Sequence, residues 1–247
     1  MRGAALSGLI VLGAMASAGA ACGGGEGPEL VEIRRLDLTG IELSFLDYLH
    51  PAFADQYPDV VAEVNGEPIT GEALAQEQVA LEFAARQETE FWAGFPSLPE
   101  EVLRGRVEDI ESADPLEAVI DNVLKRQAVE RLGLLPSYEE AVEFARQQEE
   151  SFIHPQGTVS PENREQMLEV LRLQGFPAEN WAADPRIVEG YRLGMGLVEL
   201  RNRFCELEEQ EEVEGGGLVG SVGRDCTEFL KGEREEAEIR YFVKWAE

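Results

Sequence analysis

The 247-residue chain carries 49 acidic side chains against 21 lysines and arginines, which gives a formal net charge of −28 at pH 7. This acid excess argues against nucleic-acid binding and against close docking on anionic lipid, because both anionic surfaces are held by clustered lysine and arginine side chains. A hydrophobic fraction of 44% is enough for a real core in one large or two small domains.

The first 21 residues have the pattern of an export signal. Arg2 supplies a positive start, a short apolar run follows, and small residues then lead to Cys22. The apolar run is too short to span a bilayer. Residues 19–22 resemble a bacterial lipobox, in which Cys22 is acylated, although that family usually has a larger aliphatic residue in place of Gly19. We expect this lipoprotein route; ordinary cleavage after residues 18–20 and an uncleaved anchor are the alternatives.

A flexible tether follows the expected lipidation site. The sequence GGGEG comes directly after Cys22, and glycine-rich segments behave as flexible chains. We expect residues 22–57 to be a tether with a partly ordered N-terminal segment. Within it, the alternating sequence ELVEIRRLDL predicts either a short strand or no regular structure. The anchor would place the protein outside the cytoplasm, on the outer face of a bacterial membrane.

Residues 60–70 combine strand, turn and helix-start signals in the sequence VVAEVNGEPIT. The valines favour a strand, and Asn65-Gly66 is a strong signal for a tight turn. Ile69 begins the return, and Thr70 caps a helix expected to run to about Trp92. The prolines and glycine of GFPSLP end this helix, and a short helix is expected over residues 99–110.

Three further helices have clear start signals. Asp114-Pro115 predicts a helix that ends near Leu132, with Gly133 just beyond its end. The capping box at residues 137–140 starts the next helix. Ser160-Pro161 opens another, which stops at Gly175.

The last long helix is predicted to begin at Asp184-Pro185 and to continue through Phe204. Gly194 and Gly196 weaken it, and they either let another helix pack closely or are simply tolerated. An acidic and glycine-rich loop follows, and then a helical turn around residues 229–230. Residues 237–243 alternate in polarity and predict a terminal strand.

A lone strand at residues 60–64 needs a partner for its backbone groups, and the terminal strand is the expected one. The sequence therefore predicts a mainly helical domain over residues 58–247. Its N- and C-terminal strands would form a small sheet.

The ordered motifs resemble the peptide-binding N-terminal domain of SurA, PrsA and related exported foldases. Residues 60–74 are similar to the opening strand, Val-Asn-Gly turn and helix of that domain. Residues 114–145 resemble its second long helix and the start of the next. Residues 171–181 resemble the segment before its last long helix, and residues 229–242 its closing helix and strand. The resemblance covers about residues 58–247 and implies peptide binding.

The chain departs from this family in one important respect. SurA and PrsA carry parvulin-type prolyl isomerase domains between these helices, whereas residues 150–187 have only helical sequence. The resemblance therefore does not imply isomerase activity. His50 and His154 lie beside prolines and do not make a zinc site, so we expect loop histidines, no metal and no small-molecule cofactor.

The chain has three cysteines, and lipidation of Cys22 would leave Cys205 and Cys226 as a pair. Outside the cytoplasm a disulfide between them is expected, worth about 3 kcal/mol in the chain-entropy model; two unpaired thiols are the alternative. No histidine lies near them in sequence, and no serine sits in a G-x-S-x-G frame. We therefore expect no enzyme, although an enzyme of unrecognised type stays as an alternative.

An apolar cluster at the predicted end of the helix from residue 70 is the candidate client-binding surface: Phe91, Trp92, Phe95 and Leu98. Open apolar area with an acidic surround is typical of proteins that hold unfolded chains. We expect an ATP-independent holdase for unfolded or partly folded exported polypeptides, without isomerase activity. The alternative is an adaptor lipoprotein that docks a single folded envelope or secretion partner.

Overall fold

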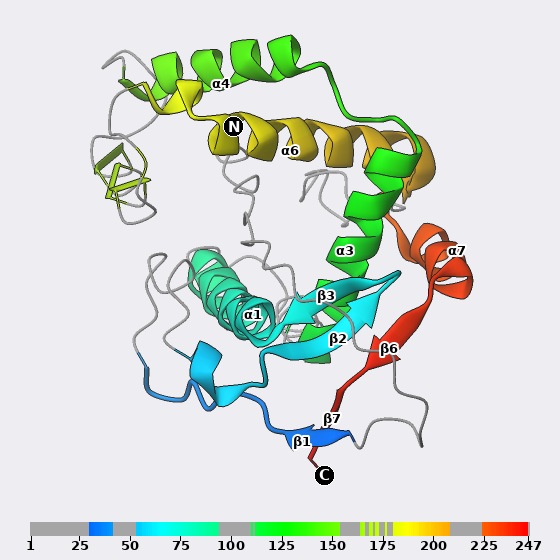
Figure 1. The fold of residues 1–247 in the computed structure, drawn as a ribbon. Helices are drawn as coiled ribbons and strands as arrows, with labels where there is room; N and C mark the ends of the chain where they lie inside the picture. Colours follow the sequence, from blue (N-terminus) through cyan, green and yellow to red (C-terminus); the bar gives the residue numbers. More distant parts are fainter. Residues whose placement is uncertain are drawn as a thin grey trace, which may run out of the picture. The chain divides into compact units, whose positions relative to one another are not determined.

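The computed structural model of the protein is shown in Figure 1. The structure describes residues 30–41, 53–93, 110, 112–153, 164–165, 168–169, 171–172, 176, 180–207 and 224–246. Within these residues the protein is mainly helical, with a small sheet made from strands near the N- and C-terminal ends of the domain. The predicted fold class is therefore confirmed.

The described residues form two compact units. The unit that we call the sheet unit contains the described residues up to Val123 and those from Ala237 onward. The helical unit contains the described residues from Leu124 to Glu236. The boundary falls inside one helix, α3 (Pro115–Arg131).

The sheet unit contains β1 (Val31–Ile33), η1 (Ala54–Gln56), β2 (Val60–Val64), β3 (Glu67–Thr70), α1 (Gly71–Ala93), β6 (Ile239–Tyr241) and β7 (Val243–Trp245). The helical unit contains α4 (Tyr138–Ile153), η2 (Trp181–Ala183), α6 (Pro185–Phe204), β4 (Glu206–Leu207), β5 (Arg224–Asp225) and α7 (Thr227–Glu236). None of the helices in the described ranges is both long and apolar enough to cross a bilayer.

The tight turn predicted at Asn65-Gly66 is present. Both residues have positive φ, 53° and 83°, as a two-residue type I′ hairpin requires, and β2 pairs antiparallel with β3 through this turn. The turn is also attached to the chain before β6. The Asn65 backbone N–H donates to the Glu238 carbonyl at 2.8 Å, and the Glu238 N–H donates to Asn65 Oδ1 at 2.8 Å. The asparagine therefore joins the hairpin to a segment 173 residues away.

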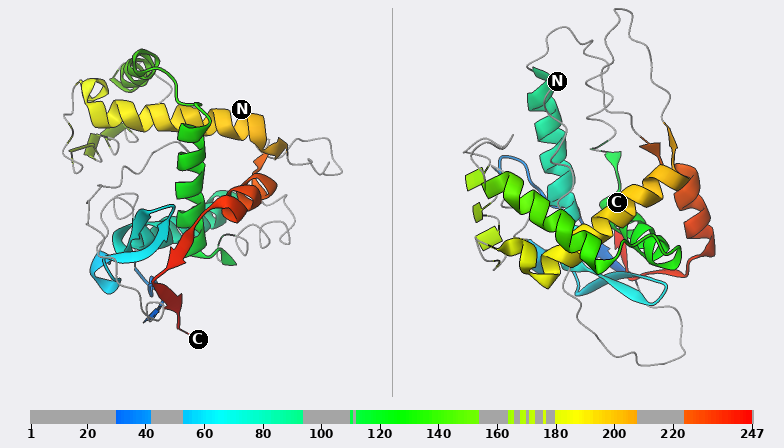
Figure 2. Two further views of the ribbon diagram at one scale, coloured as in Figure 1. Left: turned by 45° about the vertical axis from the view of Figure 1, so that its right-hand side comes forward. Right: turned by 90° about the horizontal axis from the view of Figure 1, so that it is seen from above.

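The predicted partner of β2 is confirmed, because β6 pairs antiparallel along its other side and the strand order is β3-β2-β6. The prediction of one terminal strand was wrong in detail. The chain forms two strands, drawn in red in Figures 1 and 2, and β7 pairs in parallel with β1 instead. Phe242 lies between them: its N–H donates to Val61 and its carbonyl accepts from Val31. The two sheets thus meet at Phe242, which explains why β6 and β7 are separate strands.

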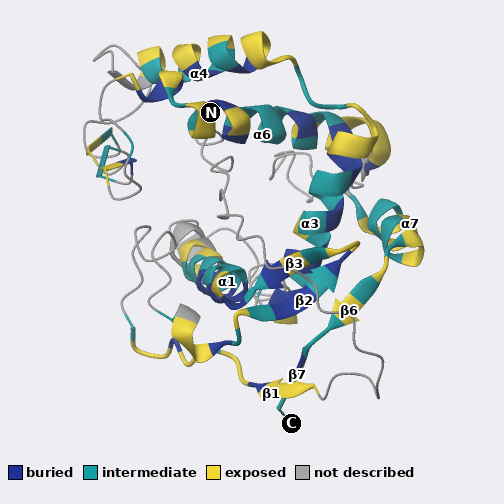
Figure 3. Cartoon of the chain, viewed as in Figure 1, coloured by how far each residue is buried: buried dark blue, intermediate teal, exposed yellow. Residues whose placement is uncertain are grey.

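The core of the sheet unit lies where β2 and β3 face the helices, dark blue in Figure 3. Its fully or almost fully buried side chains include Val61, Val64, Ile69, Leu74, Val79 and Ile120. Each such side chain is worth about 1.5–3 kcal/mol relative to leaving it in water. The burial of these side chains, and not only the hydrogen bonds between the short strands, stabilises the three-stranded sheet.

The helices begin where the capping signals predict. Thr70 Oγ1 accepts from the Ala73 N–H at 3.1 Å, and Asp114 Oδ1 accepts from the Leu116 N–H at 2.9 Å. Asp184 accepts from the Arg186 N–H at 2.9 Å. Each such cap contributes about 1 kcal/mol, because it satisfies a backbone donor that the helix leaves unpaired.

The capping box at the start of α4 is reciprocal, as its sequence predicts. The Glu140 N–H donates to Ser137 Oγ at 3.2 Å, and the Ser137 N–H donates to Glu140 Oε2 at 2.9 Å. These hydrogen bonds from Ser137 hold the pKa of the Glu140 carboxyl below its usual value. Gly133, with a φ of 65°, ends α3 as predicted.

The helical unit brings α3 and α6 into close contact at Gly196. A Cβ at this position would lie 2.6 Å from Val129 Cγ1, closer than any real contact, so the glycine is required by packing and not merely tolerated. Val129 and Leu200 are buried in the same cluster. A second cluster joins α4, η2 and α6 around Trp181 and Tyr191.

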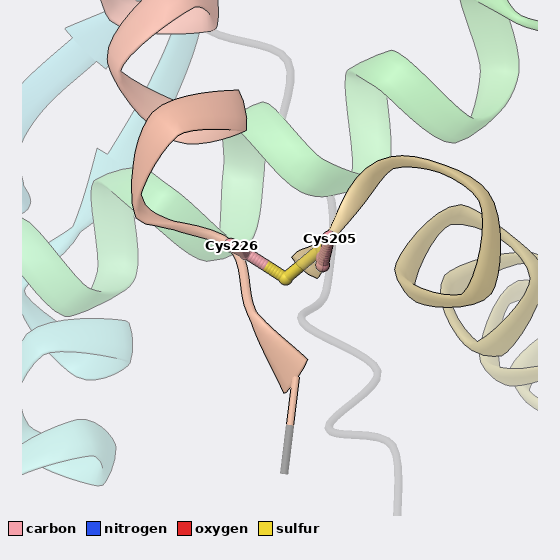
Figure 4. The surroundings of a disulfide bond; sticks show 2 residues. All are labelled: Cys205 and Cys226. Atoms are coloured by element: carbon pink, nitrogen blue, oxygen red, sulfur yellow. A yellow bond between two sulfur atoms is a disulfide. The ribbon is translucent and has the colours of Figure 1, made fainter. Parts of the chain in front are cut away.

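The predicted disulfide is present between Cys205 and Cys226, whose Cα atoms are 4.5 Å apart (Figure 4). It joins the end of α6 to the residue before α7, beside the two-residue ribbon of β4 and β5. The helix after it is longer than predicted: α7 has 10 residues, not one turn. Packing of Phe229 against the buried cluster favours the longer helix.

Candidate functional site

The predicted client-binding residues come after the part of α1 whose side chains the structure describes. Phe91 and Trp92 lie in the last turn of α1, but their side chains fall outside the described residues, as do Phe95 and Leu98 entirely. The same is true of the predicted lipidation site Cys22. His50 and His154 also lie outside the described residues. So do most of the helix predicted from Ser160 and all but Ile110 of the helix predicted over residues 99–110.

A pocket of about 150 Å³ lies beside α1, within the sheet unit. Its lining comes from three parts of the chain: residues 35–38, one face of α1, and residues 110–115. The lining residues are Arg35, Leu36, Leu38, Gln78, Leu81, Glu82, Ala85, Ile110, Ala113 and Pro115. Seven of these ten residues are leucine, isoleucine, alanine or proline, but polar atoms contribute almost as much of the exposed lining as apolar atoms do.

The wall from α1 follows from helical spacing. Gln78, Leu81, Glu82 and Ala85 stand at steps of three and four residues, which places them on one face of a helix. The opposite wall is the extended segment that follows β1, which contributes Leu36 and Leu38. The pocket therefore depends on how this segment is held against α1.

Gln78 holds the facing segment from within the core. Its side chain is 6% exposed, its Oε1 accepts from the Leu36 N–H at 2.8 Å, and its Nε2 donates to Tyr57 Oη at 2.7 Å. Tyr57 in turn donates to the Arg34 carbonyl at 2.8 Å. Burial raises the pKa of the Tyr57 phenol, so this hydroxyl keeps its proton and stays a donor. The result is a connected set of hydrogen bonds behind the pocket.

Arg86 holds the same segment further along α1. Its guanidinium donates to the Leu38 carbonyl at 2.8 Å and to the Ile41 carbonyl. It also forms an ion pair with Glu82 at 2.7 Å. The one acidic side chain in the pocket lining is therefore paired with a cation on the next turn.

The third wall is tied to the C-terminal strand. Arg35 donates to the Ala113 carbonyl at 2.9 Å, and its guanidinium lies 5.9 Å from the ring centre of Trp245. The Trp245 indole N–H donates to the Asp114 carboxylate at 3.0 Å. The acid that caps α3 thus also binds β7, and together these contacts fix residues 113–115 beside the pocket.

The pocket has room for an apolar group beside its polar atoms. Among its described lining residues there is no serine, cysteine or histidine, and the arginine and glutamate have the partners given above. In the described ranges, no group of three or more His, Cys, Asp or Glu side chains is placed to hold a metal ion. A volume of about 150 Å³ is roughly that of a benzene-sized cavity and below the ~300 Å³ of typical ligand pockets. One apolar side chain would fit.

Sequence reasoning missed Gln78, Tyr57 and Arg86, the residues that hold the pocket wall. One signal for Gln78 was available: it follows Leu74 by four residues and precedes Leu81 by three, on the apolar face of its helix. A polar residue at such a position is buried only with hydrogen-bond partners. No sequence signal identifies those partners, because they lie 42 and 21 residues away.

No protein-family profile, no curated protein and no solved structure matches the chain.

Proposed function

We propose that the protein is an exported, membrane-anchored lipoprotein that holds unfolded or partly folded extracytoplasmic polypeptides without ATP and without prolyl isomerase activity. The observation that carries this proposal is the pocket beside α1, whose volume and seven apolar lining residues suit a single apolar side chain of a client. Reversible burial of such a side chain would supply the binding free energy.

The sequence position of the candidate client-binding cluster supports a binding surface that also includes the pocket. Trp92 follows the pocket residue Ala85 by seven residues, which is two turns of α1. A client segment that places one side chain in the pocket could therefore extend along the helix toward its end. The high negative charge would keep the complex soluble.

The holdase proposal is tested by suppression of aggregation. The chain from residue 23 onward, which contains every described residue, is mixed with several unrelated denatured proteins at near-stoichiometric ratios without nucleotide. We expect suppression for most clients. Polar substitution of Leu81 together with Phe91, Trp92 and Phe95 should raise the concentration needed for half-suppression by about tenfold or more, because buried apolar contacts are lost.

Val198→Gln is the matched control. Val198 lies on α6 in the helical unit and is 57% exposed, so its replacement removes surface apolar area from the unit that does not contain the pocket. Suppression should stay unchanged in this variant. If wild type suppresses no client, the holdase proposal is wrong; if it binds a single folded partner instead, the protein is an adaptor.

The proposed anchor is tested separately by localisation. In a bacterial host, the full chain should sediment with membranes, and Cys22→Ser should release it into the soluble fraction, because the acyl chains have no other attachment point. Ala21→Ser, which leaves the cysteine in place, is the control and should keep the protein in the membrane pellet. Membrane association that survives Cys22→Ser would contradict lipidation at this residue.

A further inference from the structure

Helix α7 is held with little buried surface. None of its residues, all of which the structure describes, is buried. The helix has 10 residues and contains Gly232, and isolated helices shorter than roughly 12–15 residues are marginal in water. Its order therefore depends on attachments to the rest of the helical unit.

The non-covalent attachments of α7 include two that lie near the surface. Phe229 is partly buried against the cluster of Val129 and Leu200, and its ring centre is 5.6 Å from that of Phe204. Arg131 and Glu233 form an ion pair at 2.5 Å, but the arginine side chain is half exposed. Exposed ion pairs contribute little, because water and salt screen them.

The covalent attachment is stronger than either contact. The disulfide fixes Cys226, the residue before α7, to Cys205, which is 5% exposed in the same buried cluster. The bond closes a loop of 21 positions, and losing it would reduce the equilibrium constant for docking by about a hundredfold in the chain-entropy model. The ribbon of β4 and β5 pairs only two residues on each side and cannot replace it.

We propose that the Cys205–Cys226 disulfide is a redox-sensitive latch for α7. In the oxidised protein the latch docks the helix on the cluster around Val129 and Leu200. In the reduced protein α7 is released locally, while α4 and α6 stay folded. The helix would then become docked only in an oxidising compartment, and release would expose the partly buried Phe229, whose ring packs beside the already exposed Phe204.

The redox step needs a dithiol reductant. One of its thiolates attacks the sulfur of the partly exposed Cys226 and breaks the bond to Cys205, which leaves as a thiolate and takes up a proton. The second thiol of the reductant then displaces Cys226 from the mixed disulfide. Two electrons and two protons pass to the protein, which gains two thiols, and the reductant becomes a cyclic disulfide.

Hydrogen exchange of the full chain with and without dithiothreitol tests the latch. On reduction, amides of α7 should exchange about tenfold faster or more, whereas amides of α4 should change by less than about twofold. In the double variant Cys205→Ala/Cys226→Ala, α7 should exchange fast from the start and dithiothreitol should have no effect.

Two outcomes would overturn the proposal. Equal protection of α7 in the oxidised and reduced protein would show that its other contacts hold it. Loss of protection in α4 and α6 together with α7 would show that the disulfide stabilises the whole unit and is not a local latch. Both outcomes can be read from wild-type protein, so the test does not depend on folding of the double variant.

Discussion

Replacing Gly71 with alanine is expected to lower the free energy of unfolding by about 3 kcal/mol. A Cβ at this position would lie 2.3 Å from the Pro58 carbonyl oxygen and 2.7 Å from Tyr57 Cβ. The nearest atom belongs to the backbone, so the clash is relieved only by moving the chain that leads into β2. That chain also carries Tyr57, which helps to hold the pocket wall. Denaturant unfolding of the full chain measures the effect.

Gly232→Ala is the matched control for this prediction. Gly232 lies inside α7, and nothing is found within 4 Å of the position that its Cβ would occupy. Alanine is a better helix former than glycine, so this variant should be stabilised by about 0.5–1 kcal/mol. Equal unfolding midpoints for Gly71→Ala and wild type would show that the approach of residues 57–58 to α1 is looser than in the structure.

Replacing Gln78 with leucine is expected to cost about 2–3 kcal/mol, although leucine is apolar and of similar size. The change leaves the Leu36 N–H without its acceptor and removes the donor to Tyr57. Both groups are partly or wholly removed from water, and a buried polar group without a partner keeps the full cost of desolvation. Amides of residues 34–38 should also exchange faster, because the segment loses its attachment to α1.

Gln147→Leu is the corresponding control. Gln147 lies on the exposed face of α4 and donates only to Glu143, at 3.1 Å, so its replacement should change stability by less than about 0.5 kcal/mol. If Gln78→Leu behaves like Gln147→Leu, the hydrogen bonds of Gln78 are replaced by water and do not hold the pocket wall.

The segment that Gln78 and Arg86 bind connects the proposed anchor to the proposed binding site. The structure describes residues 30–41 of the segment expected to be a partly ordered tether, and these residues form β1 and supply Leu36 and Leu38 to the pocket. Gln78 and Arg86 bind this stretch through its backbone, so its side chains remain available as lining. A variant that detaches the segment should therefore weaken client binding without any change to an apolar residue.

The sequence by itself determined the local features of this protein. Asn65 and Gly66 tolerate positive φ, so they predict the hairpin turn without knowledge of the rest of the chain. The caps at Asp114 and Asp184 act within three residues, and they locate the starts of α3 and α6. The cysteine pairing also followed from sequence, because excluding the expected lipidated cysteine leaves two.

Only the tertiary structure decided features that depend on residues far apart. The parallel pairing of β1 with β7 joins positions more than 200 residues apart, and a three-residue strand has no pattern that specifies its partner. Gly71 has no signal in the sequence, and the signals at Gln78 and Gly196 do not identify the groups that these residues contact. Their roles arise because the fold brings another backbone or side chain within contact distance, and such distances are set by packing, which no local pattern encodes.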